Sequence, residues 1–208
     1  EEAKKSSTRK LFAQEYECEW TTTELQVYDL NEEKHLIDLE HIQARDRRYE
    51  FIAGLDVGYR DENVFVVMAT DGEEFYLVDE YVSNETTTST LAEEIQEKVD
   101  EWGIDSIYID SAAQQLKADL AYDYDIYCEN AIKSVNDGIA AVQVLIENDK
   151  LLVDVNKCGH TYSSLSSYKW NPKTENPKPV HDWASHASDA VRYAIYTHQK
   201  RSVGIFAA

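Results

Sequence analysis

The sequence predicts an α/β protein with a mixed sheet, antiparallel at first and parallel afterwards, and with helices on both faces. Three apolar runs, 51–57, 64–70 and 74–82, follow one another, and Asp71-Gly72 stands between the last two. Asp-Gly between strand-like runs is typical of an antiparallel hairpin. Beyond residue 83, short apolar runs alternate with helical patterns, and strand-helix-strand units usually add parallel strands to a sheet.

The alternating part of the chain begins with a helix whose start is marked by Thr90 and Glu93, spaced as in a capping box, and whose end is marked by Gly103. Short apolar runs and amphipathic stretches define the elements that follow. They are a strand at 106–110, a helix at 113–122, a strand at 126–128, a helix at 135–148, a strand at 150–155, a helix at 160–168, a proline-bearing loop at 171–180 and a final helix at about 182–198.

Residues 1–49 differ from the rest, because they are polar and charge-rich and nothing in them alternates long enough to build a sheet. Short helices are expected at 7–17 and 36–45, with an extended piece at 25–28. We interpret 1–49 as a linker or docking segment that follows an upstream domain, 50–203 as the folded domain and 204–208 as a tail. The absence of an initiating Met agrees with a piece of a longer chain.

The chain is strongly acidic, with 40 acidic and 20 basic residues and a formal net charge of −20 at pH 7. Nucleic-acid binding usually depends on Lys and Arg that neutralise phosphates, so this composition alone indicates a poor binder. An enzyme of this composition that acts on nucleic acid needs positive charge from divalent cations or from a partner. For most of the surface, the simpler interpretation is an acidic face that keeps the protein soluble.

The cysteines and the apolar runs indicate a soluble, intracellular protein. Cys18, Cys128 and Cys158 are far apart and lack metal-binding spacing, which favours packing roles in a reducing compartment. No apolar run approaches the roughly 20 residues that a membrane span needs, and the first residues lack the apolar core of a signal peptide.

Three aspartates stand where the chain can hold a carboxylate rigidly. Asp56 ends the first apolar run, Asp110 ends the fourth, and Asp189 lies inside the final helix. Taken singly, Asp56 could begin a turn and Asp110 could cap a helix. Asp189 lies in an apolar helical pattern, where an unpaired carboxylate is costly, so a metal or a buried basic partner is expected.

The trio predicts a phosphodiester nuclease that uses two metal ions. In-line hydrolysis needs a deprotonated water on one side and a stabilised leaving oxygen on the other, and two cations about 3.5–4 Å apart provide both. Hard cations such as Mg²⁺ or Mn²⁺ prefer carboxylate oxygens. In a mixed sheet, Asp56 can lie beside Asp110, and Asp189 can approach from a helix packed on that sheet.

Four residues are further candidates for the site. His186 precedes Asp189 by three residues and shares its side of the helix, as a metal ligand, as the acid for the leaving group or as a partner that holds Asp189; a surface histidine is the alternative. Asp61 and Glu62 follow the first strand closely enough to lean toward the metals, or are solvated turn residues. Asp182 is most simply an N-cap and only secondarily a site residue.

Basic and aromatic residues concentrate modestly in the stretch that precedes the final helix. Lys169 and Lys173 flank Trp170 and Pro172, and a loop or hairpin there could place both lysines on DNA phosphates. An exposed connection with Trp170 packed on the core explains the same residues equally well.

Three segments resemble one known family. They are 54–58 (Gly-Leu-Asp-Val-Gly), 108–111 (Tyr-Ile-Asp-Ser) and 186–194 (His-Ala-Ser-Asp-Ala-Val-Arg-Tyr-Ala). Together they look like the nuclease domain of a tailed-bacteriophage terminase large subunit, and 9–16 is similar to the segment that follows its motor domain. The motor itself is not in this sequence, which has no GxxxxGK[ST] loop.

The resemblance implies a ribonuclease H-like fold and metal-dependent cutting of double-stranded viral DNA during genome packaging. It assigns Asp56 as the ligand that bridges two ions, with Asp110 and Asp189 completing the two positions. The partners it implies are double-stranded DNA, an upstream ATPase motor domain of the same polypeptide, the portal and the small terminase subunit, in the cytoplasm of the infected bacterial host. No membrane partner is expected.

Two other classes of function fit part of the sequence. Residues 54–58 followed by a hairpin also resemble the phosphate-binding strands of sugar kinases and actin-like ATPases, although no second such signature follows residue 110. A non-catalytic module that docks a motor onto a portal would suit an acidic surface. Resolvases and transposases share the aspartates, and the 186–194 motif favours the terminase.

Overall fold

The structure is a computed structural model that describes residues 25–58, 61–172 and 178–206, the side chains of 203–206 excepted. In these residues one seven-stranded sheet has the order β1-β7-β4-β3-β2-β5-β6. The strands are β1 (Leu36–Ile37), β2 (Glu50–Asp56), β3 (Asn63–Thr70), β4 (Phe75–Ser83), β5 (Ser106–Ile109), β6 (Cys128–Asn130) and β7 (Leu151–Asp154).

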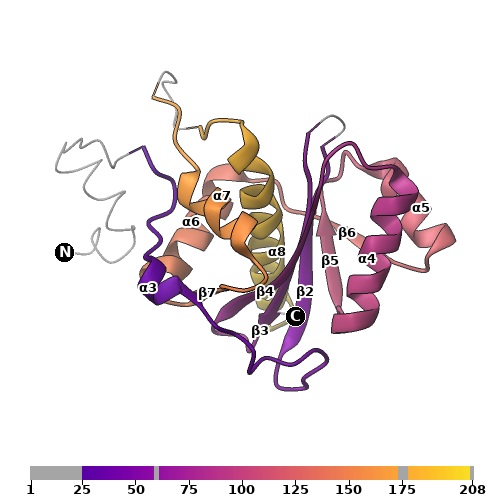
Figure 1. Cartoon of the computed structure of the whole chain (residues 1–208), viewed down its shortest axis with the longest axis horizontal. Coiled ribbons are helices and arrows are strands. Elements are labelled where there is room, and N and C mark those ends of the chain that lie inside the picture. The colour runs from indigo at the N-terminus through magenta and orange to yellow at the C-terminus, as the bar shows by residue number, and fades with distance from the viewer. Residues whose placement is uncertain (1–24, 59–60, 173–177, 207–208) are drawn as a thin grey trace.

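Helices cover both faces of the sheet. They are α3 (Glu32–His35), α4 (Thr88–Trp102), α5 (Gln114–Asp123), α6 (Val135–Glu147), α7 (Gly159–Ser167) and α8 (Trp183–Phe206). Figure 1 shows the sheet nearly edge-on, with α6, α7 and α8 on one side and α4 and α5 on the other. None of the described helices is both long and apolar enough to cross a membrane.

The strand directions confirm the predicted mixed sheet. Strands β2, β3 and β4 are antiparallel neighbours, whereas β5, β6 and β7 each join the sheet in parallel pairings. In the β2–β5 pairing, Leu55 lies opposite Ile109. Asp56 and Asp110 each follow one of these two residues, so both aspartates lie at the same end of two adjacent strands.

Alternation along β2 decides which helices Asp56 faces. Phe51, Ala53 and Leu55 are buried in the core under α4 and α5, whereas Ile52 is buried in the core under α6 and α8. Because successive side chains of a strand point to opposite faces, Asp56 shares the face of Ile52. Its carboxylate therefore lies on the side of the sheet that α8 covers.

The N-terminal region departs from the prediction at residues 36–45. Leu36 and Ile37 form β1, which pairs in parallel with β7, so the expected helix there and the expected lack of sheet residues were both wrong. The next residues run on without a helix, and the backbone N–H of Leu39 donates to Asp154 Oδ2 at 3.0 Å. Contacts with a strand more than a hundred residues away fix this conformation, and no local pattern reveals them.

The extended piece expected at 25–28 is present and packs on the domain. Val27 and Tyr28 are fully buried, and Gln26 forms an antiparallel bridge with Lys169. The helix expected at 7–17 lies outside the described residues. The role of residues 1–49 as a linker stays a prediction.

Smaller corrections concern the bounds of elements. Helix α4 begins after Thr87, whose side chain accepts from the Thr90 N–H, so the cap lies three residues earlier than predicted. Strand β6 covers 128–130 instead of 126–128, because only these residues pair with β5. Helix α8 continues to Phe206, because the apolar pattern that ended the prediction near 198 marks only its buried part.

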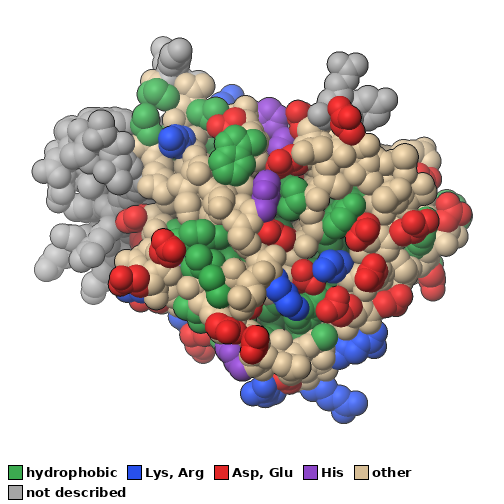
Figure 2. Space-filling view, in the orientation of Figure 1, with side chains coloured by type: hydrophobic (Ala, Val, Ile, Leu, Met, Phe, Trp, Pro, Cys, Tyr) green, Lys and Arg blue, Asp and Glu red, His purple; other side chains and the backbone are tan. Residues whose placement is uncertain are grey.

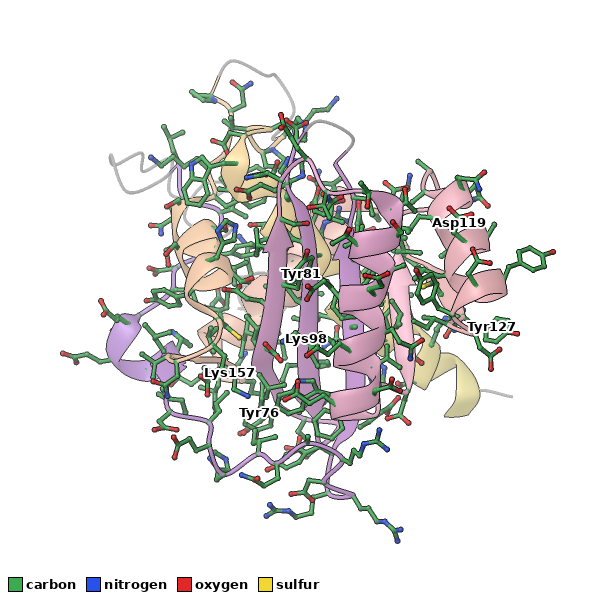
Figure 3. All side chains as sticks on the ribbon, turned by 45° about the vertical axis from the view of Figure 1, so that its right-hand side comes forward. Tyr76, Tyr81, Lys98, Asp119, Tyr127 and Lys157 are labelled. Atoms are coloured by element: carbon green, nitrogen blue, oxygen red, sulfur yellow. The ribbon has the colours of Figure 1, made fainter. Side chains whose placement is uncertain are left out.

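The face under α4 carries a buried polar contact that fastens this helix to the sheet. Lys98 lies between α4 and the strands (Figure 3) and donates to Asp79 of β4 at 2.6 Å. The indole N–H of Trp102 donates to the same carboxylate at 2.8 Å. A buried carboxylate needs such partners, so the layers are fixed on this side without any involvement of the aspartate trio.

Candidate active site

Asp56 and His186 meet where β2 ends against the first turns of α8. The Nδ1–H of His186 donates to Oδ2 of Asp56 at 2.8 Å, and both side chains are largely buried. This hydrogen bond raises the pKa of His186, more than burial lowers it. Of the partners foreseen for His186, the structure shows Asp56 instead of Asp189.

Asp110 is held by three neighbours. Its Oδ1 accepts from the backbone N–H of Ala112 at 2.7 Å and pairs with the Lys133 ammonium, and its Oδ2 accepts from the Tyr193 hydroxyl at 3.4 Å. Burial raises the pKa of Asp110, but the bonds from Lys133 and Ala112 lower it further, so it lies below its ordinary value. Asp110 thus makes the local contact of a cap and also faces α8.

Asp189 has the buried basic partner that its position in the helix predicted. Nε and Nη2 of Arg192 donate to its Oδ1 at 3.1 and 2.9 Å. Burial raises the pKa of Asp189, and the Arg192 charge offsets only part of this effect. Arg192 is 2% exposed, and it fits because a Cβ on Gly138 of α6 would lie 2.7 Å from its Cγ.

Tyr193 is the residue that all three aspartates surround. Burial raises its pKa strongly, and the negative charges of Asp189, Asp56 and Asp110 raise it further. Three carboxylates from β2, β5 and α8 therefore converge on one phenol. The sequence indicated Tyr193 as part of the 186–194 motif, and its spacing of four residues from Asp189 was the signal that both share a helix face.

The remaining acidic candidates occupy the rim of this site. Glu62 contacts Nε2 of His160 at 3.1 Å. Asp182 caps α8, since its Oδ1 accepts from the Ala184 N–H at 3.0 Å. Asp61 joins a group with His181 and His186 in which one potential ligand atom from each lies within 4.8 Å of the others. Among the described residues, the three aspartates do not form such a group.

A cavity of about 510 Å³ opens beside Asp189, between α6, α8 and the segment that precedes α8. Its lining includes Tyr168, Lys178, His181 and Ser185. Lys169 is exposed next to this lining and bridges Gln26. Lys173 lies outside the described residues. One of the basic residues of this stretch, Lys178, therefore faces the cavity that contains Asp189.

Acidic side chains dominate the surface around this site. Figure 2 shows Asp and Glu spread over the α4 and α5 side of the face in view, and histidines exposed near its upper centre. The net charge of −20 is therefore visible as an acidic surface on this side. The described basic residues near the site are few, which makes positive charge from cations or partners a requirement for any contact with phosphates.

A mixed sheet of this order, with carboxylates at the ends of adjacent central strands and a third on the covering helix, defines a ribonuclease H-like domain. The family model of the terminase RNaseH-like domain matches residues 53–197. The chain belongs to this family.

Known proteins agree with this assignment. The large terminase subunit of Escherichia phage T5 is 38% identical over 95% of this chain and 47% of that protein. The large terminase of a thermophilic bacteriophage, solved in its full two-domain length, superposes with a TM-score of 0.74 at 22% identity, over 90% of this chain and 49% of that one. The chain spans about half the length of these two relatives.

A solved nuclease domain also matches the fold. The domain from the large terminase of bacteriophage SPP1, solved with bound Mn, has a TM-score of 0.61 at 22% identity and covers 78% of this chain and 96% of its own. At this identity the likeness shows the fold alone. Together with the family match, it favours a nuclease domain over the actin-like or sugar-kinase interpretation.

Proposed function

We propose that this domain is a divalent-metal-dependent endonuclease that cuts double-stranded viral DNA during genome packaging. The observation that carries the proposal is the convergence of Asp56, Asp110 and Asp189 around Tyr193. Three carboxylates from separate elements repel one another, and a site for cations explains why the fold brings them together. Membership of the terminase family supports the same activity.

The donor set fits two hard cations such as Mg²⁺ or Mn²⁺. Carboxylate oxygens are the ligands these ions prefer. The two bonds from Arg192 both fall on Oδ1 of Asp189, which leaves Oδ2 for a cation. Asp56 would bridge the two ions, with Asp110 and Asp189 completing the positions. Bound there, two cations supply an activated water and stabilise the leaving oxygen.

The other residues of the site hold these carboxylates in place. His186 fixes Oδ2 of Asp56, Arg192 fixes Asp189, and Tyr193 and Lys133 fix Asp110. A protonated His186 also carries a proton close to the reacting phosphate, and the raised pKa of His186 favours that form. These contacts orient the ligands before DNA arrives, so the chemistry needs little rearrangement.

DNA delivery is proposed to depend on partners. The relatives are about twice as long as this chain, which supports an upstream ATPase motor domain in the same polypeptide. The portal and the small terminase subunit would bring the motor and the genome together in the cytoplasm of the infected bacterial host. Lys178 and Lys169 are the described lysines placed to contact phosphates near the site.

A plasmid assay tests this function. The 208-residue chain with Mn²⁺ or Mg²⁺ should nick and then linearise supercoiled plasmid, and excess EDTA should stop the reaction. Asp56→Asn and Asp189→Asn should each abolish cleavage, whereas Asp123→Asn, a change at an exposed carboxylate at the end of α5, should not. Cleavage that persists in EDTA or in Asp56→Asn would exclude the metal-dependent mechanism. No cleavage under any condition would favour the docking module.

A further inference from the structure

Two histidines and a carboxylate form a compact group at the rim of the aspartate site. Asp61 follows β2, and His181 and His186 lie before and within the first turns of α8. One potential ligand atom from each residue lies within 4.8 Å of the other two. The imidazole rings of His181 and His186 are 5.4 Å apart between centroids and inclined at 68°.

The hydrogen bonds of His181 determine its tautomer. The Ser185 hydroxyl donates its only proton to the Asp182 carbonyl at 2.6 Å. Its oxygen must then accept the Nδ1–H of His181 at 2.9 Å. In the neutral ring this leaves an unprotonated Nε2 with a free lone pair, which is the form that binds metals.

His186 is held in the same tautomer by a different partner. Its Nδ1–H donates to the Asp56 carboxylate, which can only accept when ionised. The neutral ring again presents a lone pair on Nε2. Metal-binding histidines usually donate their other ring N–H to a carboxylate or another acceptor, which fixes the ring orientation. Both imidazoles of this group have that arrangement.

The third member is placed by a tight turn. A Cβ on Gly58 would lie 2.9 Å from Cβ of Asp61 and from the Glu62 carbonyl oxygen. The turn therefore folds directly over Gly58, which only glycine permits without a shift. This packing brings the exposed Asp61 carboxylate back toward α8, where the two imidazoles lie.

We propose that Asp61, His181 and His186 form a cation site separate from the aspartate site and selective for transition ions such as Zn²⁺ or Co²⁺. Two imidazoles and one carboxylate suit such ions, whereas Mg²⁺ prefers oxygen ligands alone. The inference goes beyond the proposed nuclease activity and does not depend on it. An ion here would bind Nε2 of His186 while Nδ1 still holds Asp56, so the two sites share one imidazole–carboxylate pair.

Cobalt absorption tests the site without any cleavage reaction. Titration of the metal-free 208-residue chain with Co²⁺ should produce the visible absorption of nitrogen-ligated cobalt at one equivalent, and Zn²⁺ should remove it. A large excess of Mg²⁺ should leave it in place. His181→Ala should abolish the absorption, and because His181 is exposed this change should leave the circular dichroism spectrum unchanged.

Matched variants make the outcome decisive. Ser185→Ala should weaken Co²⁺ binding by about 10–100-fold, as loss of an outer partner does. His160→Ala, which removes a nearby histidine outside the group, should bind Co²⁺ like the wild type. Asp110→Asn should lose plasmid cleavage but keep the absorption, which separates this site from the nuclease activity. Wild-type absorption in His181→Ala, or its displacement by Mg²⁺, would overturn the proposal.

Discussion

Gly54 of β2 lies directly against Ala190 of α8. A Cβ added to Gly54 would be 1.9 Å from the Ala190 carbonyl oxygen and 3.2 Å from Cβ of Ala194. Gly54 precedes Asp56 by two residues, and Ala190 follows Asp189. The distance between the strand and the helix therefore also sets the distance between two of the candidate metal ligands.

Replacement of Gly54 by Ala should force α8 away from the sheet. Overpacking of a filled core usually costs about 1–3 kcal/mol, so the free energy of unfolding should fall by this amount in urea denaturation. Plasmid cleavage should fall more than the folded fraction does, because Asp189 moves relative to Asp56. Gly159→Ala is the matched control, since a Cβ there meets no atom within 4 Å. Equal stability of the two variants would contradict the contact.

Arg192 should be essential for stability because it neutralises Asp189 inside the core. Removal of one partner of a buried ion pair typically costs about 3–5 kcal/mol, since it leaves an uncompensated charge. Arg192→Met should therefore lower the free energy of unfolding by about 3 kcal/mol, near the lower end because the Asp189 side chain keeps 24% exposure.

A double-mutant cycle provides the control for this pair. Asp189→Asn in the Arg192→Met background should recover part of the lost stability, because the stranded charge is gone. Additive losses in the double variant would show that the two side chains do not interact. Unfolding in urea measures all four proteins.

His186 should make the stability of the metal-free protein depend on pH. Its pKa is raised by the hydrogen bond to Asp56 above the ordinary value of 6.5. A raised pKa in the folded state means that the protonated form is stabilised by folding, so this contribution is complete below about pH 6.5 and is lost as pH rises through the raised pKa. Urea denaturation at a series of pH values should show this decline.

Asp56→Asn should remove most of this pH dependence. The neutral amide no longer favours the imidazolium, so NMR titration should show the pKa of His186 falling, with Asp61 and Glu62 still raising it slightly. Asp123→Asn should leave the His186 titration unchanged. A His186 pKa that stays raised in Asp56→Asn would assign the shift to the rim carboxylates instead.

The acidic surface should make DNA binding by the isolated domain weak and only slightly dependent on salt. Each neutralised phosphate contributes about −0.9 to the log-log slope of affinity against salt. Lys169→Ala should flatten the slope by about this amount if Lys169 touches one phosphate. Lys150→Ala, at the opposite end of the sheet, should not change it. A tight complex with a steep slope would contradict the proposed dependence on partners.

The sequence predicted most of the sheet because its signals are local. The hairpin turn and the alternation of strands and helices indicated the directions that the pairings confirm. Strand β1 escaped prediction because two residues carry no period, and its structure depends on β7. Propensity favoured a helix there, and a tertiary contact determined the result.

The sequence placed the three aspartates on the correct elements but could not supply their partners. The shared end of β2 and β5 follows from strand order, and the burial of Asp189 follows from its apolar helix face. Lys133 and Gly138 come from a different part of the chain, so only the fold shows that they reach Asp110 and Arg192. The rim group likewise depends on the turn after β2.

The bridge between Gln26 and Lys169 also links the entry of the chain mechanically to the candidate site. The Val27 N–H donates to the Tyr168 carbonyl at 2.8 Å, and the Val180 N–H donates to the Lys169 carbonyl at the same distance. Tyr168 and Val180 both line the cavity beside Asp189. Tension applied to the chain at residue 25 would therefore load the cavity wall before it reached β1.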